Sequence, residues 1–153
     1  MRKYFLTISI LCAATFTFGQ SNFNKNDIYL EAGGNGLFGS VNYERQLTKK
    51  PGLGIRIGVG FYSENSFNVT LPVGINYLFN LKNHKSFIDA GLGVTWTGID
   101  EKILLGLHFI NFVPSIGYRK HTSKDLMWRI SVTPVINKYG FVPWLGASIG
   151  KRF

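Results

Sequence analysis

The stretch that decides the fold is FVPWLGASIGKRF, residues 141–153, with which the printed sequence ends. In steps of two back from Phe153, its side chains include Ile149, Ala147, Leu145 and Phe141. A β-strand turns successive side chains to opposite faces, so this spacing gives one apolar face and one face of glycine and polar residues. Such a strand is typical of a barrel wall that separates lipid from an interior.

Runs with the same alternation recur along the chain after Gln20, and turn residues such as Gly34-Asn35-Gly36 separate them. An even number of antiparallel strands closes into a barrel with both chain ends on one side. The predicted fold class is therefore all-β, an eight-stranded antiparallel up-and-down transmembrane β-barrel. Its strands are expected at about residues 27–33, 37–47, 52–62, 67–79, 86–97, 108–119, 126–137 and 141–153.

Residues 1–19 are predicted to be a cleaved signal peptide, which leaves residues 20–153 as the outer-membrane β-barrel domain. Two positive charges within Met1–Lys3 precede an almost uninterrupted apolar run from Tyr4 to Phe18. That run has signal-peptide length and is too short to cross a bilayer as a helix. Thr17 and Gly19 are small enough for the −3 and −1 positions of a signal peptidase site.

The single cysteine, Cys12, lies inside this predicted leader. A lipoprotein signal that acylates Cys12 is the alternative, but Leu11 is larger than the residue such signals place before the acylated cysteine. Cleavage after Gly19 removes the only thiol, which excludes disulfides, cysteine metal sites and cysteine catalysis from the mature chain.

The inward face of the predicted barrel carries mostly glycine, together with a balanced set of charges. Counted from the turns on the side of the termini, five of them fall three to five residues along their strands, so we expect one layer. Buried charges must be paired to be tolerated, and we therefore predict an internal ion-pair network. Arg119, near the predicted end of its strand, is left outside this layer. The network residues are Glu31, Glu44, Arg56, Asp89 and Arg129.

This layer has two interpretations. It could be a gate or a proton-linked site, or a structural plug. We favour the plug, because an eight-stranded barrel has an interior just wide enough for side chains to fill.

Four prolines interrupt the predicted strands, namely Pro72, Pro114, Pro134 and Pro143. Proline cannot donate to a β-ladder, and a closed barrel has no free edge at which to place it. If residues 138–140 form a hairpin turn, Pro134 and Pro143 lie almost opposite each other. They mark either a bulge or early end of pairing, or a lateral opening to lipid.

Candidate catalytic and cofactor groups are few. His121 and Ser123 have a His-x-Ser spacing, but they fall in a predicted turn without a carboxylate that would complete a catalytic site. No metal or cofactor site is predicted. The net charge of +9 does not indicate nucleic-acid binding, because the basic residues are spread over several turns without an aromatic stacking platform. Enzymatic activity is left open, and a non-catalytic role is favoured.

The alternation that ends on Phe153 resembles the C-terminal signature of bacterial outer-membrane barrels, whose final aromatic residue is read by the barrel-insertion machinery. Lys151 departs from that signature, which usually has an apolar or aromatic residue there. Over residues 20–153 the chain resembles the small outer-membrane β-barrel domain proteins of Gram-negative bacteria. The resemblance implies a bacterial outer-membrane location with both mature termini periplasmic. The implied partners are outer-membrane lipids and the insertion machinery, without a protein partner of known identity.

From these features we predict a non-catalytic integral outer-membrane β-barrel with a plugged, ion-paired lumen and a structural or interaction role. The alternative is a lipid-modifying or lipid-transporting outer-membrane barrel with lateral access near Pro134 and Pro143.

Overall fold

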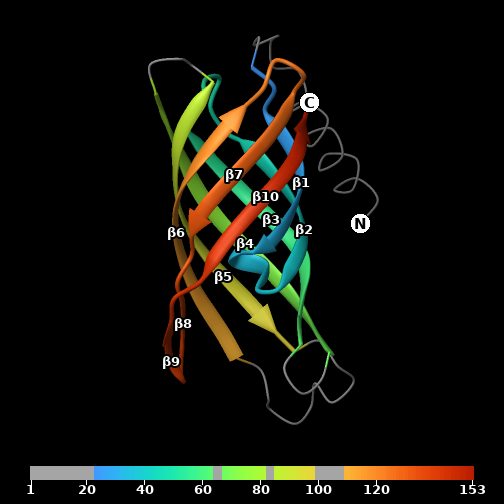
Figure 1. Cartoon of the computed structure of the whole chain (residues 1–153), viewed down its shortest axis with the longest axis vertical. Helices are drawn as coiled ribbons and strands as arrows, with labels where there is room; N and C mark the ends of the chain where they lie inside the picture. Colours follow the sequence, from blue (N-terminus) through green and yellow to red (C-terminus); the bar gives the residue numbers. More distant parts are fainter. Residues whose placement is uncertain (1–22, 64–66, 82–84, 99–108) are drawn as a thin grey trace, which may run out of the picture.

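The computed structural model describes residues 23–63, 67–81, 85–98 and 109–153. These residues form an antiparallel barrel whose strands wind obliquely around a common axis (Figure 1). The predicted signal peptide, its cleavage site and Cys12 lie outside the described residues. No helix among the described residues has the length and apolar character needed to cross a membrane.

The barrel wall has eight successive strand positions, which we call staves. The seventh stave is divided into β7 and β8, and the eighth into β9 and β10. Closure comes from the antiparallel pairing of β1 with β10, and β5 with β6 completes the circle. The predicted eight-stranded antiparallel barrel is therefore confirmed. The strands are β1 Asn26–Gly33, β2 Gly39–Gln46, β3 Leu53–Ser63, β4 Phe67–Asn80, β5 Ser86–Thr97, β6 Phe109–His121, β7 Leu126–Val132, β8 Val135–Asn137, β9 Gly140–Val142 and β10 Leu145–Arg152.

The seventh and eighth staves were expected to be continuous, but β8 follows β7 after a break at Pro134, and β10 follows β9 after a break at Pro143. Their register nevertheless runs unchanged through both breaks. Val132 pairs with Leu145 on the side of the breaks nearer the termini, and Val135 pairs with Val142 on the far side. The backbone N–H of Thr133 donates to the carbonyl of Trp144 at 2.8 Å. The two staves thus form one long hairpin whose ladder is interrupted.

The two faces of the wall have opposite polarity, as the alternation predicts. On β7, Ile130 faces outward and is 61% exposed, whereas the neighbouring Arg129 faces inward and is 2% exposed. Outward apolar side chains of this kind continue around the whole wall. An apolar surface of this extent is unfavourable in water and favourable in lipid.

The β1–β2 connection folds into the barrel instead of extending outward. Its 3-10 turn, η2 (Gly34–Gly36), is buried together with Leu37, and it lies against β3 to β6 as well as β10. The backbone enters this turn through Gly33 and Gly34 with φ of 71° and 69°, a conformation that glycine adopts without a steric cost. The strand predicted from residue 37 accordingly begins at Gly39.

Side chains of the wall hold this inward turn. The Thr95 hydroxyl donates to the carbonyl of Asn35 at 2.5 Å, and the Thr70 hydroxyl donates to the carbonyl of Gly36 at 3.1 Å. Gly93 provides the space for the turn, because a Cβ at that position would collide with the side-chain amide of Asn35. The turn therefore occupies part of the barrel interior.

Candidate functional site

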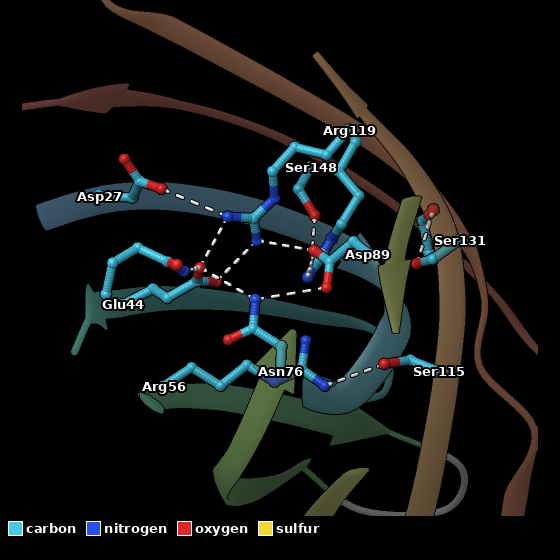
Figure 2. A network of polar contacts seen from close by, with 12 residues as sticks. Asp27, Glu44, Arg56, Asn76, Asp89, Ser115, Arg119, Ser131 and Ser148 are labelled. Carbon is cyan, nitrogen blue, oxygen red and sulfur yellow. Dashed lines mark hydrogen bonds and ion pairs between the residues drawn. The ribbon is translucent and has the colours of Figure 1, made fainter. Parts of the chain in front are cut away.

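Arg119 lies at the centre of the polar network inside the barrel, completely buried (Figure 2). Its two terminal nitrogens each donate to one carboxylate oxygen of Glu44, both at 2.6 Å. The same guanidinium lies 2.8 Å from Asp89 Oδ2 and 3.3 Å from Asp27 Oδ2. A bidentate arginine–carboxylate pair is among the strongest polar contacts in proteins and fixes the geometry of both groups.

Arg129 forms the second half of the network. It makes an ion pair and hydrogen bond with Glu31, and its other terminal nitrogen lies 3.2 Å from Asp89 Oδ2. Ser148 accepts a further hydrogen bond at 3.2 Å, and the guanidinium lies 5.2 Å from the centre of the Tyr29 ring. Asp89 thus connects the two arginines into one cluster.

Neutral amides add hydrogen bonds to two of the carboxylates, Glu44 and Asp89. The side-chain nitrogen of Asn76 donates to Glu44 at 3.0 Å and to Asp89 at 3.3 Å. Gln46 donates to the same Glu44 oxygen at 2.9 Å. Buried charges are tolerable only when their hydrogen-bonding capacity is used in this way.

Four of the five residues predicted for the network are in direct ionic contact with an opposite charge: Glu31, Glu44, Asp89 and Arg129. Arg56 is buried in the same interior, but the ion pairs found among the described residues do not include it. Its guanidinium donates to the Ser115 hydroxyl at 3.2 Å. Arg56 pairs with Glu44 in the register of β2 and β3, so it lies level with the network without taking part in the ion pairs of the described residues.

The sequence reasoning missed Arg119 and Asp27. The sixth strand was expected to end at Arg119. Instead, β6 continues to His121, so Arg119 lies within the strand and its side chain is buried in the lumen. The register sets Arg119 directly opposite Arg129 on β7. Two like charges in this position repel each other unless an anion lies between them, and Asp89 supplies it. The inward parity of Arg119 with Gly117 and Ser115 was the available signal.

Apolar groups fill the lumen on the side of the termini. Leu78, Phe87 and Met127 are buried there at 1% exposure or less. Beyond them, Arg152 makes an ion pair with Asp27 at 3.3 Å and lies 4.7 Å from the centre of the Phe23 ring. Buried side chains thus occupy the lumen on the side of the termini as well as within the charge network.

A second apolar cluster lies at the end of the lumen opposite the termini, near β8. It comprises Leu37 from the inward turn, Val113 and Val135, with Tyr62 and Trp144 packed against it. A cavity of about 320 Å³ adjoins this cluster. It is lined by Leu37, Phe38, Tyr62, Asn111, Val135, Asn137, Val142 and Trp144.

The predicted proline pair lies at this end and belongs to a row of three. The register of the long hairpin sets Pro134 opposite Pro143. Val132 pairs with Ile116, and Ile136 pairs with Phe112, so Pro134 also lies opposite Pro114 on β6. All three positions share the outward parity of the lipid-facing residues.

This row removes hydrogen bonds at one place in the wall. Because Thr133 bonds across to Trp144, alternation turns the backbone nitrogen of the next residue, Pro134, toward β6. Pro114 and Pro134 therefore occupy a pair that would normally exchange two N–H···O bonds, and neither residue has an N–H. The ladder between β6 and the seventh stave stops at Ile116–Val132 and resumes at Phe112–Ile136.

The remaining sequence candidates do not assemble into a catalytic site. His121 is buried in the lumen, with its ring 4.7 Å from that of Phe87, whereas Ser123 is exposed in the following turn. Within the described ranges, no group of three or more His, Cys, Asp or Glu residues is placed to hold a metal ion.

Phe153 lies where the end of the chain pairs with β1 and closes the barrel. Its backbone N–H donates to the carbonyl of Asn26 at 2.8 Å, and its carbonyl accepts from Asn26 N–H at 3.1 Å. The ring is exposed, as is the outward Lys151 two residues earlier. Recognition of Phe153 by insertion machinery stays a prediction.

Comparison with known proteins gives a likeness of fold. No family model and no curated protein matches the chain. The solved structure of the N-terminal β-barrel domain of Pseudomonas aeruginosa OprF matches with a TM-score of 0.60, covering 86% of this chain and 100% of that one. The chain has the fold of a small outer-membrane β-barrel domain. At 11% identity the likeness concerns the fold alone, and the predicted resemblance is confirmed at that level.

Proposed function

We propose that this protein is an integral outer-membrane barrel that is closed to solutes and has a structural or interaction role. The observation that carries the proposal is the filling of the lumen at successive levels. Arg119 and its carboxylates occupy the middle, with 0% exposure for Arg119 and Glu44. The inward turn and the apolar groups lie at either side. An eight-stranded wall encloses little more than the volume of these side chains.

Conductance measurements test the proposal. Purified protein reconstituted into planar lipid bilayers should give no discrete current steps, because the buried Arg119–Glu44 pair and its neighbours occupy the middle of the lumen. A porin inserted in the same bilayer is the positive control. Folding is checked in the same sample by the change in gel mobility on heating. Reproducible current steps from folded protein would contradict a closed lumen.

The second candidate is a lipid-modifying or lipid-transporting barrel with lateral access near Pro134 and Pro143. The row of three prolines favours it, because the wall there has lost ladder hydrogen bonds that lipid cannot replace. Pro143 turns its nitrogen away from the seventh stave, toward the side on which β1 has already ended at Gly33. A proline is suited to such an unpaired edge.

Lipid analysis separates the two candidates. If lipid passes through the wall, deleting the protein should change the acylation pattern of lipid A or the phospholipid composition of the outer membrane, as seen by mass spectrometry. The double variant Pro134→Val/Pro143→Val should reproduce the change when it replaces the wild type, because it removes both prolines and returns to position 134 an N–H that faces β6. Identical lipid profiles in all three strains would leave only the structural role.

A further inference from the structure

The wall between the long hairpin and β2 is built differently from the rest of the barrel. β1 ends opposite Gly146, so residues 140–145 have no β1 residues opposite them. No described strand pairs with the outer edge of β9. Two side-chain contacts bridge this gap instead. The Phe38 and Trp144 rings stack with centroids 5.9 Å apart, and Trp144 Nε1 donates to the carbonyl of Leu37 at 3.1 Å.

The cavity of about 320 Å³ lies directly behind this aromatic bridge, since Phe38 and Trp144 both line it. Its rim residues Phe38 and Val142 are 40% and 46% exposed. Its inner wall is the apolar cluster of Leu37, Val113 and Val135, of which Leu37 and Val135 line the cavity. Val142 pairs with the buried Val135, so the two side chains share the lumen face. The cavity is therefore part of the lumen, and it adjoins the gap in the wall that Phe38 and Trp144 span.

The lining favours an uncharged, apolar occupant. None of the eight lining residues carries a charge. The two polar ones, Asn111 and Asn137, are engaged in a chain of hydrogen bonds. Asn137 Nδ2 donates to Asn111 Oδ1, Asn111 Nδ2 donates to the Thr97 hydroxyl, and Asn137 Oδ1 accepts from the backbone of Tyr139, each at 2.8–2.9 Å. These groups hold the hairpin to β6 and leave the cavity apolar in character.

We propose that this cavity binds one acyl chain of a membrane phospholipid, which enters between Phe38 and Trp144 from the lipid side. The inference deepens the second proposed function and rests on its lateral opening. Three observations support this occupant. In a membrane barrel, hydrocarbon surrounds the wall and meets its gap beside β9, six of the eight lining residues are apolar or aromatic, and the volume is at the lower end of ligand pockets. That volume suits part of a single chain, and the charged headgroup stays outside.

Trp144 supplies a probe inside the cavity wall. Single-tryptophan proteins are made by replacing the other two tryptophans with phenylalanine, leaving either Trp144 or Trp96. Trp96 is 52% exposed on β5 near the same end of the barrel, and it does not line the cavity. Both proteins are reconstituted in phosphatidylcholine vesicles that contain increasing fractions of brominated phosphatidylcholine, which quenches tryptophan on contact.

A bound chain brings the quencher to Trp144. In vesicles made wholly of brominated phosphatidylcholine, Trp144 should be quenched at least as strongly as the outward-facing Trp96, although Trp144 has the lumen parity. Val142→Phe, which adds a ring at the rim, should reduce the quenching of Trp144 severalfold by overpacking the entrance. Val132→Phe is the matched control, because Val132 is 51% exposed on the outward face of β7 and does not line the cavity. It should change nothing.

Three outcomes decide between the proposals. Much weaker quenching of Trp144 than of Trp96, or equal Trp144 quenching in Val142→Phe and Val132→Phe, would overturn the acyl-chain site. Trp144 quenching that Val142→Phe suppresses, with unchanged cellular lipid profiles, supports the site and removes lipid modification or transport. Gel mobility before and after heating checks that each variant has folded.

Discussion

Replacing Arg119 with methionine should lower the free energy of unfolding by about 3–5 kcal/mol, because it leaves the buried carboxylates of Glu44 and Asp89 without this guanidinium. Methionine keeps the volume of the aliphatic part of arginine and carries no charge, so the loss reports mainly the missing ion pairs. Urea unfolding in lipid vesicles, followed by tryptophan fluorescence and by gel mobility, measures the change.

Arg45→Met is the matched control. Arg45 follows Glu44 in β2 and faces outward, where it is exposed, so its substitution should change the free energy by no more than about 0.5 kcal/mol. Adding Glu44→Gln to Arg119→Met should recover about 1 kcal/mol or more, since the stranded charge is removed. Equal stabilities for Arg119→Met and Arg45→Met would show that the network does not stabilise the barrel.

Substituting Gly93 with valine should expel the inward turn. The new Cβ would overlap the side chain of Asn35, and overpacking of this kind costs about 1–3 kcal/mol. The hydrogen bond from Thr95 to the Asn35 carbonyl should break with it. Urea unfolding gives the free energy, and limited proteolysis tests whether residues 34–37 have become accessible.

Ala90→Val controls for added volume on β5. Residue 90 has the outward parity, so its side chain enlarges toward lipid and should leave both stability and protease resistance unchanged. If Gly93→Val is as stable and as protease-resistant as the wild type, the turn does not depend on the space that Gly93 provides.

The strand pattern was predictable because alternation is a local property. A one-residue slip would turn Ile130 inward and Arg129 toward lipid, so each strand can occupy only one face orientation. The same parity identified Glu31, Glu44, Asp89 and Arg129 as interior charges. The strand spanning residues 86–97 was predicted with its observed ends.

Contacts across the lumen were not predictable in the same way. Which guanidinium meets which carboxylate depends on strand register and on the small diameter of the barrel. Arg119 was excluded by a strand end placed two residues early, although it is the centre of the network. Arg56 was included on its parity and its distance from the turns, and among the described residues its side chain donates to Ser115 and makes no ion pair.

By itself, the sequence determined that the wall is a closed antiparallel barrel with apolar side chains outside, since a period of two fixes which face each residue occupies. Only the tertiary structure decided how the interior is filled. The inward turn at Gly34–Leu37, the sharing of Asp89 by two arginines, and the alignment of Pro114, Pro134 and Pro143 all join residues far apart in the chain. Their meeting depends on register and curvature, which no local pattern encodes.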